Sequence, residues 1–156
     1  MTVNATIMTE KSKSNRGQTI VEFAFIIVLL FILILGIMEF GIVLYDKSVL
    51  TDACREGARA GVVFKSDPTT FAYDPMTEAE IKTVIDNYAQ SRLLTFGAPF
   101  DATTDVVVAW NPNPPSHGSE LDVRVNFTYT FLALPNLGDL GTGTLDLSAK
   151  SVMRME

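Results

Sequence analysis

The sequence predicts an α+β protein in which a long N-terminal helix, part of it transmembrane, precedes a small head of one helix and about three antiparallel strands. The segment Phe23–Met38 is a run of 16 residues without a charged or strongly polar side chain. This run continues into an amphipathic stretch that reaches Val63 without a proline. Near the C-terminus, Leu121–Phe131 alternates strictly between apolar and polar residues, which indicates a half-buried strand. A long helix packed on an antiparallel sheet is therefore the expected architecture.

The charge of the chain is uneven along its length. Its net charge is −6, but residues 1–17 carry +2, from Glu10, Lys11, Lys13 and Arg16. Because lysine and arginine stay on the cytoplasmic side of a membrane helix, we expect a single-pass protein of the cytoplasmic (inner) membrane, with its N-terminus inside and its head outside. The acidic remainder argues against a nucleic-acid partner. The single cysteine rules out an internal disulfide bond.

The apolar run is long enough to cross a bilayer. The segment Ile20–Tyr45 has 26 residues, which would span about 39 Å as a helix. A cleavable secretory signal would have a shorter apolar region, of about 7–15 residues. We expect one helix over about Thr19–Val63, within a segment 18–63 whose transmembrane half is about 20–45. Gly36 and Gly41 lie in this helix, and they either let it bend or let another helix pack closely against it.

Two glutamates interrupt the apolar run. Glu22 lies near its start, and a carboxylate at the centre of a membrane helix would cost roughly 2.5–3.5 kcal/mol on insertion scales. Such a group persists where it has a partner or a use, or where it lies at the headgroups and is solvated. Glu39 lies near the outer end of the run. It is either solvated at the membrane interface or paired with a partner protein.

The stretch Asp46–Val63 has two faces at helical spacing. Its apolar and small positions recur every three or four residues and are Val49, Leu50, Ala53, Gly57, Ala60 and Gly61. The opposite face carries charged residues, with ion pairs expected at Asp52–Arg55 and Glu56–Arg59. We expect the apolar face to pack against the head, with Gly57 and Gly61 allowing a close approach of the backbones. Cys54 is either a small packing residue or the site of an intermolecular disulfide.

The head, residues 64–156, begins with a loop over Phe64–Met76. A capping box of Thr77 and Glu80 then starts a helix, which is expected over Glu78–Phe96 and ends before Gly97. Three strands follow in the sequence. They are expected over Asp105–Trp110, Leu121–Phe131 and Thr144–Arg154, with turn-rich connections over Asn111–Ser119 and Ala133–Gly143.

The sequence offers little for catalysis. No nucleophile–base pair, metal-ligand cluster or phosphate-binding loop stands out among its residue patterns. The one histidine, His117, lies in a turn-rich loop and is expected to be solvated. We therefore expect no enzymatic activity, no cofactor and no metal.

The start of the helix resembles a processing motif. The segment GQTIVEF, residues 17–23, resembles the prepilin cleavage motif of type IV pilin-like proteins. The resemblance implies a basic leader over residues 1–17, cleavage between Gly17 and Gln18 by prepilin peptidase, and Glu22 as the fifth residue of the mature chain. It also implies that Glu22 pairs with the N-terminal amine of a neighbouring subunit. The start codon is either Met1 or Met8.

The resemblance extends along the helix and narrows to one family. An RGQ–VEF start, a GIxEFG segment and an AxREGAR segment occur in this order, a pattern similar to the TadE-like family of the tight-adherence (Tad) pilus and secretion system. The matching positions are Arg16, Gly17, Gln18, Val21, Glu22, Phe23, Gly36, Ile37, Glu39, Phe40, Gly41, Ala53, Arg55, Glu56, Gly57, Ala58 and Arg59. The resemblance implies a pilin-like (pseudopilin) structural or assembly subunit of a Tad/Flp-type system with a pilin-like head outside the membrane. Its implied partners are prepilin peptidase, other pilin-like subunits and Tad-type machinery.

The same resemblance implies how such a subunit assembles. The apolar helices would bundle laterally, with Glu22, Phe23 and Glu39 among the assembly residues, and the subunit could then enter an extracellular pilus. Two other classes of function stay open at this point. One is a signal-anchored, single-span binding module with an extracytoplasmic head, for which the leader and Glu22 would be dispensable. The other is a membrane-anchored enzyme, which lacks an evident site in the sequence.

Overall fold

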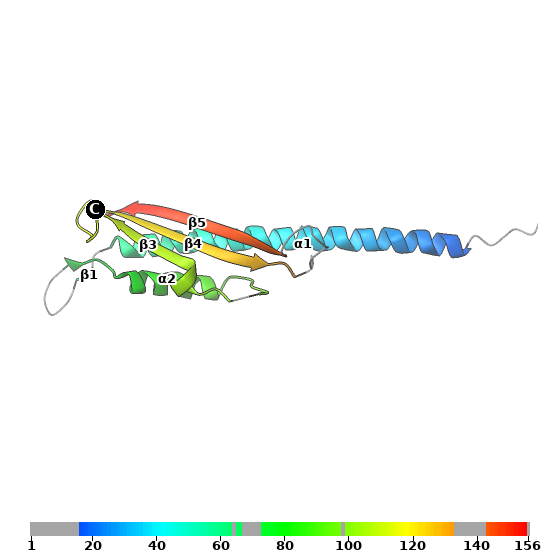
Figure 1. Cartoon of the computed structure of the whole chain (residues 1–156), viewed down its shortest axis with the longest axis horizontal. Coiled ribbons are helices and arrows are strands. Elements are labelled where there is room, and N and C mark those ends of the chain that lie inside the picture. The colour runs from blue at the N-terminus through cyan, green and yellow to red at the C-terminus, as the bar shows by residue number, and fades with distance from the viewer. Residues whose placement is uncertain (1–15, 64, 67–72, 98, 133–142, 156) are drawn as a thin grey trace, which may run out of the picture. The chain divides into compact units, whose positions relative to one another are not determined.

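The computed structural model describes residues 16–63, 65–66, 73–97, 99–132 and 143–155. Within these ranges the order of elements is α1, β1, β2, α2, α3, β3, β4 and β5 (Figure 1). The chain divides into two compact units, Met1–Ile34 and Leu35–Glu156. The expected leader before Arg16, most of the expected loop over 64–76 and the connection over 133–142 lie outside the described residues.

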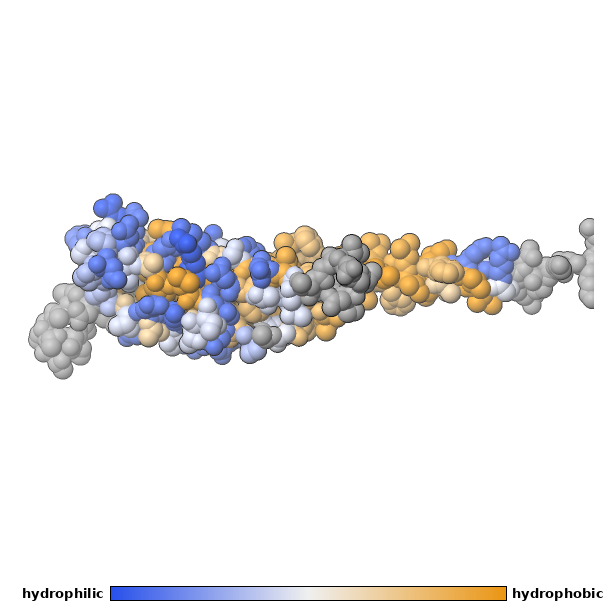
Figure 2. All heavy atoms as spheres, viewed as in Figure 1, coloured by the Kyte–Doolittle hydropathy of each residue, from blue (hydrophilic) through white to orange (hydrophobic). Residues whose placement is uncertain are grey.

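Helix α1, Arg16–Gly61, is the longest element, with 46 residues. It begins three residues earlier and ends two residues earlier than expected, and it runs without a break through Gly36 and Gly41. In the first unit its apolar side chains are exposed, and Phe25 is 76 % exposed. By length and composition, α1 is the one helix in the described part of the chain that could cross a membrane. Figure 2 shows the apolar surface along this helix.

Helix α2, Glu78–Gln90, begins where the sequence predicts but ends earlier than expected. The predicted capping box is confirmed: the Thr77 hydroxyl accepts from the backbone N–H of Glu80, and the Glu80 carboxylate accepts from the backbone N–H of Thr77. The expected end at Phe96 is wrong because the backbone N–H of Leu94 does not continue the helix. It donates instead to Oδ1 of Asp46, 3.0 Å away on α1.

The sheet has three antiparallel strands in the order β3-β4-β5. Strand β3 is Val106–Asn111, β4 is Glu120–Thr130 and β5 is Thr144–Arg154, all within one residue of the expected bounds. The register pairs Val106 with Val125, and Thr130 with Thr144. Three short elements were not predicted. They are the two-residue pair β1 (Lys65–Ser66) and β2 (Tyr73–Asp74), and the short helix α3 (Ala102–Asp105), which Asp101 caps through the backbone N–H of Thr103.

One face of the sheet makes the core of the second unit. The alternating residues Leu121, Val123, Val125, Phe127 and Tyr129 of β4 are all buried. They pack with the buried face of α1 after Leu35 and with α2, which contributes Ile81, Ile85 and Ala89 (Figure 1). The polar residues of β4 lie on the other, more exposed face. A long N-terminal helix and a small three-stranded antiparallel sheet confirm the α+β prediction.

Candidate assembly interface

The first turns of α1 carry the residues of the expected processing motif. The side chains of Gln18 and Glu22 are exposed, as is Gly17. Nε2 of Gln18 donates a hydrogen bond to Oε1 of Glu22 at 2.9 Å, one helical turn away. Phe23, the next residue, is 62 % exposed. This end of α1 therefore presents a carboxylate, already bound by an amide of its own chain, beside an open aromatic surface.

The glycines of α1 fall into two groups. A Cβ added to Gly36 or Gly41 would meet no heavy atom within 4 Å. A Cβ on Gly57 would instead collide with Ile85 of α2, and one on Gly61 would collide with Leu121 of β4 and approach Cδ1 of Ile81 to 2.8 Å. The structure thus places the second pair in close contact with the head, and leaves the first pair open to its surroundings.

Glu39 is the most consequential of the predicted site residues. Its side chain is only 3 % exposed. Oε1 accepts two hydrogen bonds, from the phenol of Tyr129 at 2.9 Å and from the backbone N–H of Leu132 at 2.7 Å. Burial and the bond to Glu39 raise the pKa of Tyr129, so the phenol stays protonated and remains the donor. The expectation that Glu39 is solvated is therefore wrong, because its own chain encloses the carboxylate.

Asp46, two helical turns after Glu39, is a second buried carboxylate that accepts a backbone N–H of the head. It is fully buried, and its Oδ1 accepts the backbone N–H of Leu94 at 3.0 Å. Among the residues that the structure describes, its Oδ2 has no hydrogen-bond partner. The two carboxylates of α1 thus bind the backbone of the segments that follow α2 and β4, at Leu94 and at Leu132. They join α1 to both layers of the head.

The remaining polar features of α1 are structural. The predicted ion pairs are confirmed, with Arg55 3.3 Å from Asp52 and Arg59 2.8 Å from Glu56. Cys54 is fully buried in the core, which fits the packing alternative. Within the described ranges, no group of three or more His, Cys, Asp or Glu side chains could hold a metal ion.

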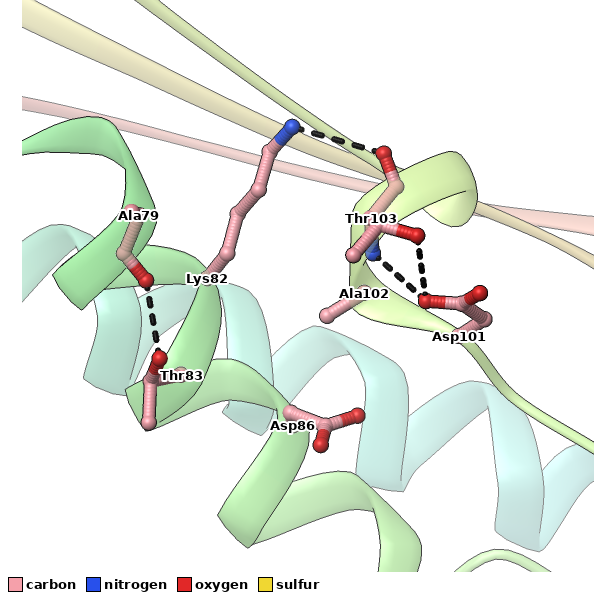
Figure 3. Close-up of a pocket in the computed structure, with 7 residues that line it drawn as sticks. All are labelled: Ala79, Lys82, Thr83, Asp86, Asp101, Ala102 and Thr103. Atoms are coloured by element: carbon pink, nitrogen blue, oxygen red, sulfur yellow. Dashed lines mark hydrogen bonds between the residues drawn. The ribbon is translucent and has the colours of Figure 1, made fainter.

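A pocket of about 300 Å³ lies between α2 and α3 (Figure 3). It is lined by Ala79, Lys82, Thr83, Asp86, Asp101, Ala102 and Thr103. Lys82 and Asp101 are engaged locally, and Oδ2 of Asp86 accepts from Gln90, whereas the buried Oδ1 of Asp86 has no hydrogen-bond partner among the residues that the structure describes. Lys82 pairs with Glu78 at 3.0 Å and donates to the backbone oxygen of Thr103, and the Asp101 carboxylate accepts from the backbone and the hydroxyl of Thr103. These contacts cap α3 and tie it to α2, and they present no nucleophile with a base beside it.

Part of α1 resembles a known protein family. The family model "TadE-like protein" matches residues 17–59. Over these residues the chain is similar to the TadE-like family. The resemblance predicted from the three-part pattern is thereby confirmed, although the rest of the chain lies outside the match. No curated protein and no solved structure matches the chain.

The TadE-like segment contains every site residue predicted from the sequence except Gly61. It also contains Asp46, which the sequence analysis did not single out as a site. Helical periodicity could have indicated Asp46, because a residue seven positions after Glu39 lies on the same face of a helix. The partners Leu94, Tyr129 and Leu132 lie in the head, and no local pattern marks them.

Proposed function

We propose that this chain is a pilin-like (pseudopilin) structural or assembly subunit of a Tad/Flp-type pilus or secretion system. The TadE-like match over residues 17–59 carries the proposal, because it covers the processing motif, the apolar helix and the segment that holds the head. Family membership associates the chain with the Tad pilus machinery and points to a structural role. The single apolar helix near the N-terminus suggests a single-pass membrane anchor. In this proposal the head lies outside the cytoplasmic membrane.

The first proposed step is removal of the leader by prepilin peptidase between Gly17 and Gln18. Both residues lie in the first turn of α1, where a helix has the fewest internal hydrogen bonds and opens most readily. Glycine has no Cβ, so its extended backbone would fit a narrow protease groove. The new N-terminus would then lie four residues before Glu22, at the exposed end of the helix.

Intact mass tests this processing step. The membrane-extracted protein should lose residues 1–17 in cells that contain their prepilin peptidase, and it should keep them in cells that lack it. Gly17→Leu should prevent the loss, because a branched side chain would obstruct the groove. An unchanged mass in the presence of the peptidase would refute the proposal and leave an anchored binding module as the better description.

The second proposed step is lateral assembly through α1. The exposed apolar side chains of residues 20–38 would pack against those of other pilin-like helices, and Glu22 would pair with the freed amine of a neighbouring subunit. Gln18 already binds the Glu22 carboxylate in the single chain, so this amide would orient the carboxylate before assembly. The open surroundings of Gly36 and Gly41 suit a close approach of such helices.

We expect Glu22→Ala to leave membrane insertion and processing intact but to reduce incorporation into assemblies at least about tenfold, since a buried amine would lose its counter-charge. The measurement is the amount of subunit in sheared pilus or cross-linked assembly fractions, relative to total subunit. Glu56→Ala, which removes an exposed carboxylate of the same helix, is the matched control and should assemble normally. Normal incorporation of Glu22→Ala would contradict the pairing.

A further inference from the structure

Four of the exposed apolar side chains of the second unit lie near Glu39 along α1 or at the head residues that its hydrogen bonds reach. We call this set, Phe40, Leu44, Leu132 and Leu145, the apolar rim. Their exposed fractions are 63 %, 55 %, 61 % and 40 % respectively. Phe40 and Leu44 belong to α1, whereas Leu132 follows β4 and Leu145 lies near the start of β5. Single exposed apolar side chains are common, whereas several together mark a surface that contacts a partner or a membrane.

Hydrogen bonds to the buried Glu39 fix the head residues of the rim beside one turn of α1. Its carboxylate accepts the backbone N–H of Leu132 itself, at 2.7 Å. It also accepts the phenol of Tyr129, and Tyr129 is the register partner of Leu145 across β4 and β5. Both rim residues of the head are therefore fixed next to the turn of α1 that contains Glu39.

The length of the apolar segment places that turn at a membrane boundary. Between Ile20 and Met38 the helix has no charged residue except Glu22. This stretch would span about 28 Å, close to the roughly 30 Å hydrocarbon core of a bilayer. Glu39 is then the first residue beyond the core. Its enclosure by Tyr129 and Leu132 keeps the carboxylate away from lipid at a depth where an unpaired charge is unfavourable.

We propose that the apolar rim inserts into the surface of the same bilayer that α1 crosses, so that lipid covers Leu132 and Leu145. The proposal rests on the proposed anchoring by α1. In the sequence, Phe40 lies just beyond the apolar segment that ends at Met38, and phenylalanine and leucine are typical of apolar faces that enter the interfacial layer. The other end of β5 differs, because the exposed Val152 lies between the charged residues Lys150 and Arg154. Leu145 of the apolar rim and the charged neighbours of Val152 thus lie at opposite ends of β5.

Depth-dependent fluorescence quenching tests the proposal on the full chain. The protein is reconstituted in phosphatidylcholine–phosphatidylglycerol vesicles in a Cys54→Ala background, which removes the one cysteine. A small environment-sensitive dye is attached at Leu132→Cys or at Leu145→Cys, and lipids carrying a nitroxide near the headgroup are added. Both substitutions keep the backbone N–H that Glu39 binds and the β5 register. We expect about a twofold loss of fluorescence at each position.

Val152→Cys is the matched control. It lies on the same strand, is similarly exposed, and is seven residues further along, about 23 Å away in an extended strand. We expect no quenching there. Equal quenching at positions 145 and 152 would overturn the proposal, because lipid contact would then not be confined to the rim.

A dye at Ile26→Cys separates this inference from the proposed anchoring. Quenching of that dye by nitroxides deep in the acyl chains, without quenching at positions 132 and 145, would overturn the rim proposal and leave the anchor intact. Absence of quenching at position 26 would overturn both. Quenching at 26, 132 and 145, with none at 152, is the result expected.

Discussion

Replacing Glu39 with alanine is expected to lower the free energy of unfolding of the second unit by about 3 kcal/mol. The substitution leaves two buried donors, the phenol of Tyr129 and the backbone N–H of Leu132, without their acceptor. Each such loss costs about 1–3 kcal/mol, and more when the lost partner was charged. The measurement is urea unfolding of the detergent-solubilised protein, followed by the fluorescence of its one tryptophan, Trp110.

Two further variants test whether the loss of stability in Glu39→Ala comes from the lost hydrogen bonds. Glu39→Gln keeps an acceptor oxygen and should cost only about 1 kcal/mol. Tyr129→Phe removes one donor and should also cost about 1 kcal/mol, and its effect should be smaller in the Glu39→Ala background because the two residues interact. A change below about 0.5 kcal/mol in Glu39→Ala would show that the buried carboxylate does not hold the head on α1.

The second large effect is expected from Gly57→Val, which should destabilise the second unit by about 3 kcal/mol or prevent its folding. A Cβ at position 57 would collide with the side chain of Ile85, which is fully buried. Valine adds two methyl groups beyond that Cβ, and an overpacked core typically loses about 1–3 kcal/mol, occasionally more. The same urea unfolding measurement applies.

Gly41→Ala is the matched control for this variant. It changes a glycine of the same helix where no heavy atom lies within 4 Å of the added Cβ. Alanine is the better helix former, so Gly41→Ala should be neutral or should stabilise by up to about 1 kcal/mol. If both variants had the same effect, the contact between α1 and α2 at Gly57 would not explain the loss of stability.

These two variants concern residues of the TadE-like segment, which the proposed function connects with processing and assembly. The segment therefore carries two kinds of group. Gly17, Gln18 and Glu22 are exposed at its start, where other proteins could reach them. Glu39 and Gly57 are buried against the head of their own chain. A variant with an assembly defect must accordingly be checked for folding before it is read as an interface defect.

Much of the fold could be predicted because its signals are local. The capping box at Thr77 and the strict alternation in β4 each need only a few neighbouring residues to be recognised. The apolar run Phe23–Met38 and the three spaced motifs of the TadE-like pattern are likewise properties of consecutive residues. For this reason the α+β class, the long helix, the three strands and the resemblance to the TadE-like family followed from the sequence by itself.

The tertiary structure alone decided which groups meet. Glu39 finds its partners 90 and 93 residues away, and Asp46 finds its partner 48 residues away. Neither separation leaves a periodic trace in the sequence. The same long-range bond explains why α2 stops before Leu94, although helical spacing alone favoured a longer helix. A buried carboxylate must be paired or hydrogen-bonded wherever the chain can supply a donor, and that requirement is met by folding rather than by local pattern.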